Sequence, residues 1–186
     1  MSRRLFMIRN APAENAEAYA LFEDGEDSLR PLSPHGEELM QRTAPWIARQ
    51  LGSSAVICCS PALRTRHSAE ILCAAMPEGS SAASPNLMPE LAPAEPAMSA
   101  LRALHRFKKA ETIALVGHEE SLTKLSSWLI SGTEKPLLAV PEGGICQLTF
   151  KADLQAGAGK LQWFLPPDLI DKLASCEALT TPGAAS

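Results

Sequence analysis

Short apolar runs alternate along this chain with longer segments in which apolar residues recur every three or four positions. The short runs have the length of buried strands, and the longer segments have the period of helices that cover a sheet. Because a sheet covered on both faces buries its strands completely, the alternation predicts an α/β fold. We expect three layers, α/β/α, around a mainly parallel central sheet with strands at 5–8, 55–59, 112–116, 145–150 and 161–165.

Several helix boundaries carry residues that suit helix ends. Ser33-Pro34 is typical of an N-cap followed by a first helical position, and Gly52 is typical of the end of the same helix. Pro45 lies inside this segment and should kink or split the helix, because proline has no backbone N–H to donate. The pair Ser60-Pro61 repeats the starting signal and predicts another helix directly after a strand.

The remaining segments predict a single domain. Residues 11–30 are polar and predict a loop or a short helix, while the Pro-, Ser- and Ala-rich stretch 77–96 predicts a connection with a brief strand at 87–91. We expect one α/β domain over residues 1–170 and a C-terminal extension over 171–186 that ends in a flexible tail.

Composition narrows the functional classes. With 186 residues, 46% hydrophobic and 20% charged, the chain is typical of one soluble globular domain. A net charge of −4 offers no attraction to nucleic acid or anionic membranes, and no apolar run approaches the roughly 20 residues of a membrane span. Only about four apolar residues precede Arg9, too few for a signal peptide, so we expect a cytoplasmic protein.

Cysteine and histidine spacing predicts no cofactor. The five cysteines are odd in number and form no Cys-x-x-Cys pair, which favours buried thiols. No spacing of histidines and cysteines supplies a closed ligand set for zinc, so we expect neither a metal nor another cofactor.

Three predicted strands run directly into polar residues that suit an anion. Arg9 follows the first strand, Arg64 follows the second after a short turn, and His118 follows the third. Because the carboxyl ends of parallel strands meet at one edge of a sheet, these side chains should converge there. Arginine suits phosphate because its planar group gives paired, charge-assisted hydrogen bonds. We therefore expect a phosphate site at this edge.

These segments resemble the motifs of the histidine phosphatase superfamily, whose fold is phosphoglycerate mutase-like. The family begins with a strand followed by Arg-His-Gly or Arg-His-Ala, carries a Ser-Pro-x-x-Arg turn, and places Gly-His after a later strand. The SixA-type phosphohistidine phosphatases add an Arg-Pro-Leu-Thr/Ser segment before the first long helix. The corresponding segments, in order within residues 4–170, are Arg9-Asn10-Ala11, Arg30-Pro31-Leu32-Ser33, Ser60-Pro61-Ala62-Leu63-Arg64 and Gly117-His118, with a SixA-like Trp163-Phe164-Leu165-Pro166-Pro167 near the end.

The resemblance implies a pocket in which Arg9, Arg64 and His118 hold a phosphoryl group around position 10. It also implies two weaker candidates: Glu90 as an acid residue and Arg30 at the border of the pocket, although Arg30 could simply pair with Asp27 at the surface. The expected ligand is phosphate, a phosphorylated small molecule or a protein that carries phosphohistidine. The oligomeric state is open.

Asn10 stands where the family has its nucleophilic, transiently phosphorylated histidine. A carboxamide nitrogen is a poor nucleophile because its lone pair is delocalised, yet it can imitate the near ring nitrogen of histidine as a hydrogen-bond donor. We therefore expect a SixA-like homologue that binds phosphate but is catalytically impaired. Two explanations fit: Asn10 is natural and marks a pseudoenzyme, or it is an engineered substitution in an active phosphatase. We favour the natural one, because alanine is the more usual inactivating choice.

Two alternatives to this enzyme class remain at this stage. The chain could be a non-enzymatic module that recognises phosphohistidine or another phosphoprotein. Alternatively, Cys58 and Arg64 match the Cys-x5-Arg spacing of cysteine-based phosphatases. The second alternative is disfavoured because Pro61 removes a backbone donor from the loop and Cys58 lies within an apolar strand.

Overall fold

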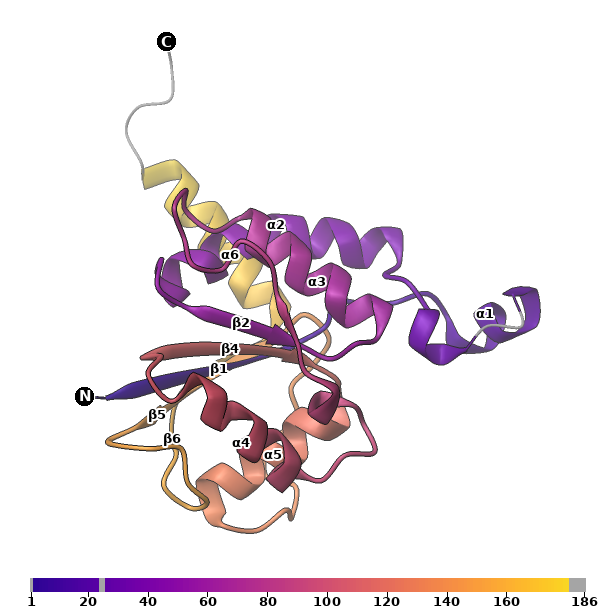
Figure 1. The fold of residues 1–186 in the computed structure, drawn as a ribbon. Helices are drawn as coiled ribbons and strands as arrows, with labels where there is room; N and C mark the ends of the chain where they lie inside the picture. Colours follow the sequence, from indigo (N-terminus) through magenta and orange to yellow (C-terminus); the bar gives the residue numbers. More distant parts are fainter. Residues whose placement is uncertain (1, 24–25, 181–186) are drawn as a thin grey trace.

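The computed structural model describes residues 2–23 and 26–180 (Figure 1). The described strands form one sheet in the order β3-β2-β4-β1-β5-β6. Their bounds are β1 (Arg3–Arg9), β2 (Val56–Cys59), β3 (Asn86–Leu87), β4 (Thr112–Gly117), β5 (Ile145–Phe150) and β6 (Lys160–Leu165). The first four strands are parallel and the last two pair antiparallel, so the predicted mainly parallel sheet is confirmed.

Helices cover both faces of the sheet and complete the predicted three layers (Figure 1). The helices α2 (Pro34–Leu51), α3 (Leu63–Ala74) and α6 (Pro167–Thr180) pack on one face, and α4 (Ala97–Leu104) and α5 (Glu119–Ser131) pack on the other. The remaining elements are α1 (Ala16–Glu23) and the 3₁₀ turns η1 (Asp27–Leu29), η2 (Pro89–Leu91) and η3 (His105–Phe107).

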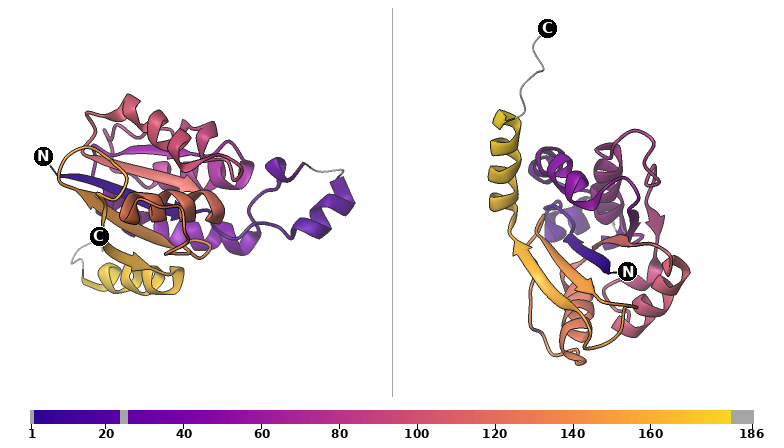
Figure 2. Two further views of the ribbon diagram at one scale, coloured as in Figure 1. Left: turned by 90° about the horizontal axis from the view of Figure 1, so that it is seen from below. Right: turned by 90° about the vertical axis from the view of Figure 1, so that its left-hand side faces the viewer.

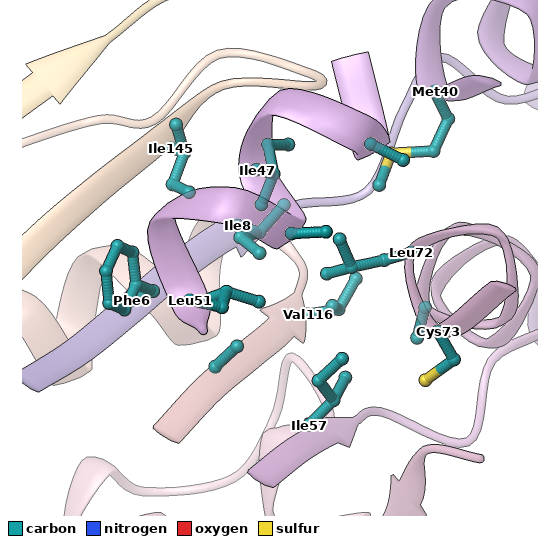
Figure 3. Close-up of a cluster of buried hydrophobic side chains, with 14 of the residues drawn as sticks. Phe6, Ile8, Met40, Ile47, Leu51, Ile57, Leu72, Cys73, Val116 and Ile145 are labelled. Atoms are coloured by element: carbon teal, nitrogen blue, oxygen red, sulfur yellow. The ribbon is translucent and has the colours of Figure 1, made fainter. Parts of the chain in front are cut away.

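Alternation along the strands divides the core into two clusters. On β1, Phe6 and Ile8 pack against α2, whereas Leu5 and Met7 belong to the cluster on the opposite face. Figure 3 shows the first cluster, where Ile47 of α2 meets the sheet among other buried side chains. Because successive residues of a strand point to opposite faces, an unbroken apolar run is what a strand buried on both sides requires.

The helix α2 begins as its sequence predicts. The hydroxyl of Ser33 accepts a hydrogen bond from the N–H of Gly36 at 3.1 Å, and the helix ends at Gly52, whose φ is +80°. Pro45 was expected to kink or split the helix, and the split is wrong, because one helix spans Pro34–Leu51. Burial of the side chains after the proline, including Ile47, holds the helix together despite the missing backbone donor.

The start of α3 was predicted less well. The helix begins at Leu63 rather than directly after Ser60, and its N-cap residue, Ala62, makes no side-chain capping bond. Ser60 is buried instead at the end of β2. The expected brief strand at 87–91 is also corrected, because β3 ends at Leu87 and η2 follows.

The helix α1 lies outside the three layers, and α6 extends beyond the predicted end of the domain. Figures 1 and 2 both show α1 projecting away from the sheet, beyond the carboxyl ends of the parallel strands. The helix α6 continues past residue 170, where the sequence analysis placed the domain boundary, and Arg42 of α2 pairs with its Asp171 at 3.0 Å. The tail was expected over 180–186; Thr180 is the last residue of α6, and residues 181–186 lie outside the described residues. No helix in the described part of the chain has the length and apolarity of a membrane span.

Gly36 provides a test of how α2 is seated. A Cβ at this position would collide with the backbone carbonyl of Pro12, which follows β1. Alanine normally favours a helix over glycine by about 1 kcal/mol, yet we expect Gly36→Ala to lower the free energy of unfolding by about 1–3 kcal/mol. Urea denaturation measures this change. Glu38→Ala, at an exposed position of the same helix, is the control, and a Gly36→Ala variant more stable than wild type would contradict the packing.

Candidate phosphate-binding site

Backbone pairing brings the ends of β1, β2 and β4 side by side. The register of β1 and β4 runs to the last pair, Arg9 and Gly117, and the N–H of Asn10 then donates to the Gly117 carbonyl at 3.0 Å. The N–H of Ser60, the first residue after β2, donates to the carbonyl of Val116 at 3.1 Å. The first residues beyond the three strands are therefore neighbours, as the sequence analysis expected of a parallel sheet.

His118 lies at the centre of this edge and is 7% exposed. Its Nε2 lies 3.1 Å from the hydroxyl of Ser60. Burial lowers the pKa of His118 to about 4, and surrounding charges modify this shift, with Arg64, Arg30 and Arg9 lowering the pKa and Asp27 raising it. The imidazole is therefore neutral at pH 7, and the arginines from three separate segments act on it together.

Asn10 is buried, with 4% of its surface exposed. Its side-chain nitrogen, Nδ2, donates a hydrogen bond to the backbone carbonyl of Ala11 at 2.9 Å. The Ala11 N–H in turn donates to the hydroxyl of Ser68 in α3 at 3.2 Å. Asn10 is thus held as a structural donor, in the manner expected of the near ring nitrogen of a histidine.

Arg9 contacts the α5 side of the sheet. Its guanidinium lies 2.6 Å from the carboxylate of Glu119, donates to the carbonyl of Val140 at 3.2 Å, and lies 3.7 Å from Glu142. Strand alternation explains this direction, because Arg9 is two residues beyond Met7, which also belongs to the α5-facing cluster. Arg9 also borders an open groove of about 540 Å³ between the first turns of α2 and α6.

Arg64 is 7% exposed and points into the site from the first turn of α3. Both of its terminal nitrogens donate to Asp27, one to the backbone carbonyl at 2.6 Å and one to the carboxylate at 2.8 Å. The other carboxylate oxygen accepts from Nε of Arg30 at 2.8 Å, and Arg30 also donates to the carbonyl of Glu14 at 2.6 Å. Arg30 therefore both pairs with Asp27 and belongs to the charged cluster.

Glu90 lies apart from this cluster. It follows β3 at the same edge of the sheet. Its carboxylate lies 3.7 Å from the guanidinium of Arg106. Among the described residues, no hydrogen-bond donor reaches its buried Oε2. The charges that shift the pKa of His118 do not include Glu90. Its contacts give it no partner in the proposed pocket.

The cysteine-phosphatase alternative is wrong. Cys58 is fully buried in the cluster on the α4 and α5 face, and burial raises the pKa of its thiol to about 12. A thiol that is neutral and enclosed cannot act as the attacking thiolate.

The structure adds three residues that sequence reasoning did not assign to the site. Ser60 was interpreted as a helix cap but contacts His118. Asp27 was considered only as a surface partner of Arg30, a pairing that its spacing of three residues already indicated. Glu119 directly follows His118, and no sequence signal connected it with Arg9, 110 positions away.

Comparison with known proteins supports the fold. No protein-family model matches the sequence, and a search of curated proteins found no match. A solved structure assigned to the SixA phosphohistidine phosphatases, from Nakamurella multipartitia, is 23% identical with a TM-score of 0.70, covering 90% of this chain and 97% of that chain. The protein histidine phosphatase SixA complexed with tungstate is 21% identical with a TM-score of 0.71, covering 90% and 99%.

This chain has the histidine phosphatase fold. A more distant structure with this fold, a mutant phosphoserine phosphatase from Entamoeba histolytica in complex with phosphoserine, is 15% identical with a TM-score of 0.61, covering 87% of this chain and 96% of that chain. The predicted phosphoglycerate mutase-like architecture of the histidine phosphatases is therefore confirmed.

The lowered pKa of His118 predicts a pH-dependent stability. The folded-state pKa of about 4 lies below the ordinary value of 6.5, so the unfolded chain binds the proton more tightly between these values. The contribution of neutral His118 is fully present above pH 6.5 and is lost as pH falls towards 4. We expect the stability difference between wild type and His118→Gln to change by about 3 kcal/mol over this window.

Urea denaturation at several pH values between 4 and 7 measures this difference. His35→Gln, at an exposed histidine, is the matched control and should leave the pH profile of wild type unchanged. Parallel pH profiles of wild type and His118→Gln would contradict the burial of a neutral imidazole.

Proposed function

We propose that this chain is a SixA-like homologue whose pocket binds a phosphoryl group, and whose turnover is impaired because Asn10 replaces the phospho-acceptor histidine. The observation that carries the proposal is the position of Asn10 beside His118, next to the last pair of β1 and β4. The positive charges of Arg9, Arg30 and Arg64 act on the same His118 imidazole. The match to a SixA structure that holds tungstate, an analogue of phosphate, supports an oxyanion as the ligand.

The residues divide into groups that bind and a group that would react. Arg64 and Arg30 supply charged donors suited to phosphoryl oxygens, and neutral His118 can donate one ring N–H or accept a proton when an anion arrives. In the histidine phosphatases that the sequence resembles, the position of Asn10 supplies the attacking nitrogen. Here the only nitrogen of that side chain is a delocalised amide bound to the Ala11 carbonyl. Binding therefore survives in this proposal and attack on phosphorus does not.

A phosphohistidine borne by a protein is the ligand class that we favour. The connection from β1 to α2 carries α1 and η1 beyond the strand ends, and α1 projects away from the sheet (Figures 1 and 2). In this proposal the site is therefore accessible to a group carried on a protein. A non-enzymatic module that recognises such a protein differs from an impaired phosphatase only in turnover, so both are tested together.

Tungstate binding and phosphatase turnover are measured for wild type, Asn10→Ala and Asn10→His. We expect wild type to bind tungstate by calorimetry but to hydrolyse a phosphohistidine peptide no faster than Asn10→Ala. Asn10→His should exceed wild type in turnover, by up to about 10⁶-fold, because an imidazole restores a nucleophile. Labelled phosphate should be trapped on the Asn10→His variant only.

Fast turnover by the unmodified chain would overturn the assignment of an impaired enzyme. Failure of tungstate to bind any of the three proteins would overturn the phosphate pocket itself. Binding without turnover in both wild type and Asn10→His would favour the binding module.

A further inference from the structure

Asp27 contacts both Arg30 and Arg64 through its carboxylate. Its two carboxylate oxygens lie 2.8 Å from Arg30 and 2.8 Å from Arg64, so one carboxylate bridges two guanidinium groups. Its backbone carbonyl takes the second terminal nitrogen of Arg64 at 2.6 Å. Asp27 therefore uses the same charge-assisted donors that a phosphoryl group would need.

Burial differs sharply between the two partners. The side chain of Arg64 is 8% exposed, whereas that of Asp27 is 61% exposed and lies on the solvent side of the pair. A buried guanidinium requires a partner, because an unpaired charge in a protein interior is costly. The exposed carboxylate, in contrast, can return to water at little cost.

Apart from the bonds of Asp27 to Arg30 and Arg64, the turn η1 is contacted by the Tyr19 hydroxyl of α1, which donates a hydrogen bond to the Leu29 carbonyl at 3.2 Å. The turn η1 contains no buried residue, and its preceding residue makes no side-chain capping bond. The neighbouring helix α1 projects away from the sheet in Figures 1 and 2. Segments with few buried contacts open locally at low free energy. Departure of η1 from the arginines would therefore break the hydrogen bonds of Asp27 without exposing a core side chain.

We propose that Asp27 is an internal anionic competitor that occupies Arg30 and Arg64 until a phosphoryl group displaces it. This inference rests on the proposed function, namely that the pocket binds phosphate. Because Asp27 is tethered to the same chain, it competes at a high effective concentration and lowers the apparent affinity of every external anion by the same factor. Only ligands with strong intrinsic affinity, such as doubly charged phosphoryl groups, then bind at low concentration.

Calorimetric titration of tungstate and of inorganic phosphate into wild type, Asp27→Asn and Glu26→Gln tests the competition. We expect Asp27→Asn to bind both anions roughly threefold to tenfold more tightly, with the same factor for each, since exposed ion pairs are individually weak. Glu26→Gln removes the same charge one residue away, where the carboxylate accepts a hydrogen bond from the Ser28 hydroxyl at 3.2 Å, and should bind as wild type does.

Weaker binding by Asp27→Asn would overturn the proposal, because it would make Asp27 a residue that positions Arg64 for the ligand. Equal tightening in Glu26→Gln would also overturn it, since a general charge effect would then suffice. Absence of tungstate binding in all three proteins would instead refute the phosphate pocket on which the proposal rests.

A second measurement uses the unmodified chain and does not depend on the folding of a variant. Partial burial would raise the pKa of the Asp27 carboxyl, but hydrogen bonds and charges from Arg30 and Arg64 outweigh it and lower the pKa. Carbon NMR titration of Asp27 should show this low pKa in the free protein and a return towards the ordinary value at saturating tungstate. A pKa that stays low in the tungstate complex would show that Asp27 is not displaced, and would overturn the proposal.

Discussion

The parallel pairing of β1 with β4 is the constraint on which the rest of the site depends. Its register ends with Arg9 opposite Gly117, so Asn10 and His118 begin at the same height beyond the sheet. A shift of one residue would exchange the buried faces of β1, placing Phe6 and Ile8 against α5 and carrying Asn10 to the wrong side. Core packing and site geometry are therefore fixed by the same hydrogen bonds.

Charge compensation is the second organising feature. The arginines gathered at this edge would repel one another without anions, and each finds a carboxylate nearby: Glu119 beside Arg9, and Asp27 between Arg30 and Arg64. Burial is the main cause that lowers the pKa of His118 to about 4, and the nearby arginines lower it further. The arginines at this edge are thus paired with carboxylates of the same chain, Glu119 and Asp27.

In the proposed function, Asn10 separates binding from chemistry. The side chain keeps a hydrogen bond to the Ala11 carbonyl and the burial that an inward-facing residue needs, so the surrounding strand ends are undisturbed. Reactivity depends instead on a free nitrogen lone pair, which a carboxamide lacks. The proposal therefore combines an intact pocket and its arginines with the absence of a side chain that could attack phosphorus.

The sequence by itself determined the layers and the edge at which the site lies. Apolar runs of strand length predict buried strands, and capping residues such as Ser33 and Gly52 predict helix ends. Both predictions depend on residues close together in the sequence and not on the position of the segment in the fold. The order of strands followed by arginine or histidine also indicated convergence at their carboxyl ends, because parallel strands share that edge.

Only the tertiary structure decided how these side chains are partnered. Glu119 meets Arg9 because α5 starts where β4 ends beside β1, and Ser60 contacts His118 rather than capping α3 because β2 pairs with β4. Asp27 reaches Arg64 across 37 positions, on a turn without buried residues whose place no local pattern records. Such contacts form between residues that are far apart in the sequence, and they depend on how the strands pair and on which charges are buried. The spacing of residues along the chain gives neither.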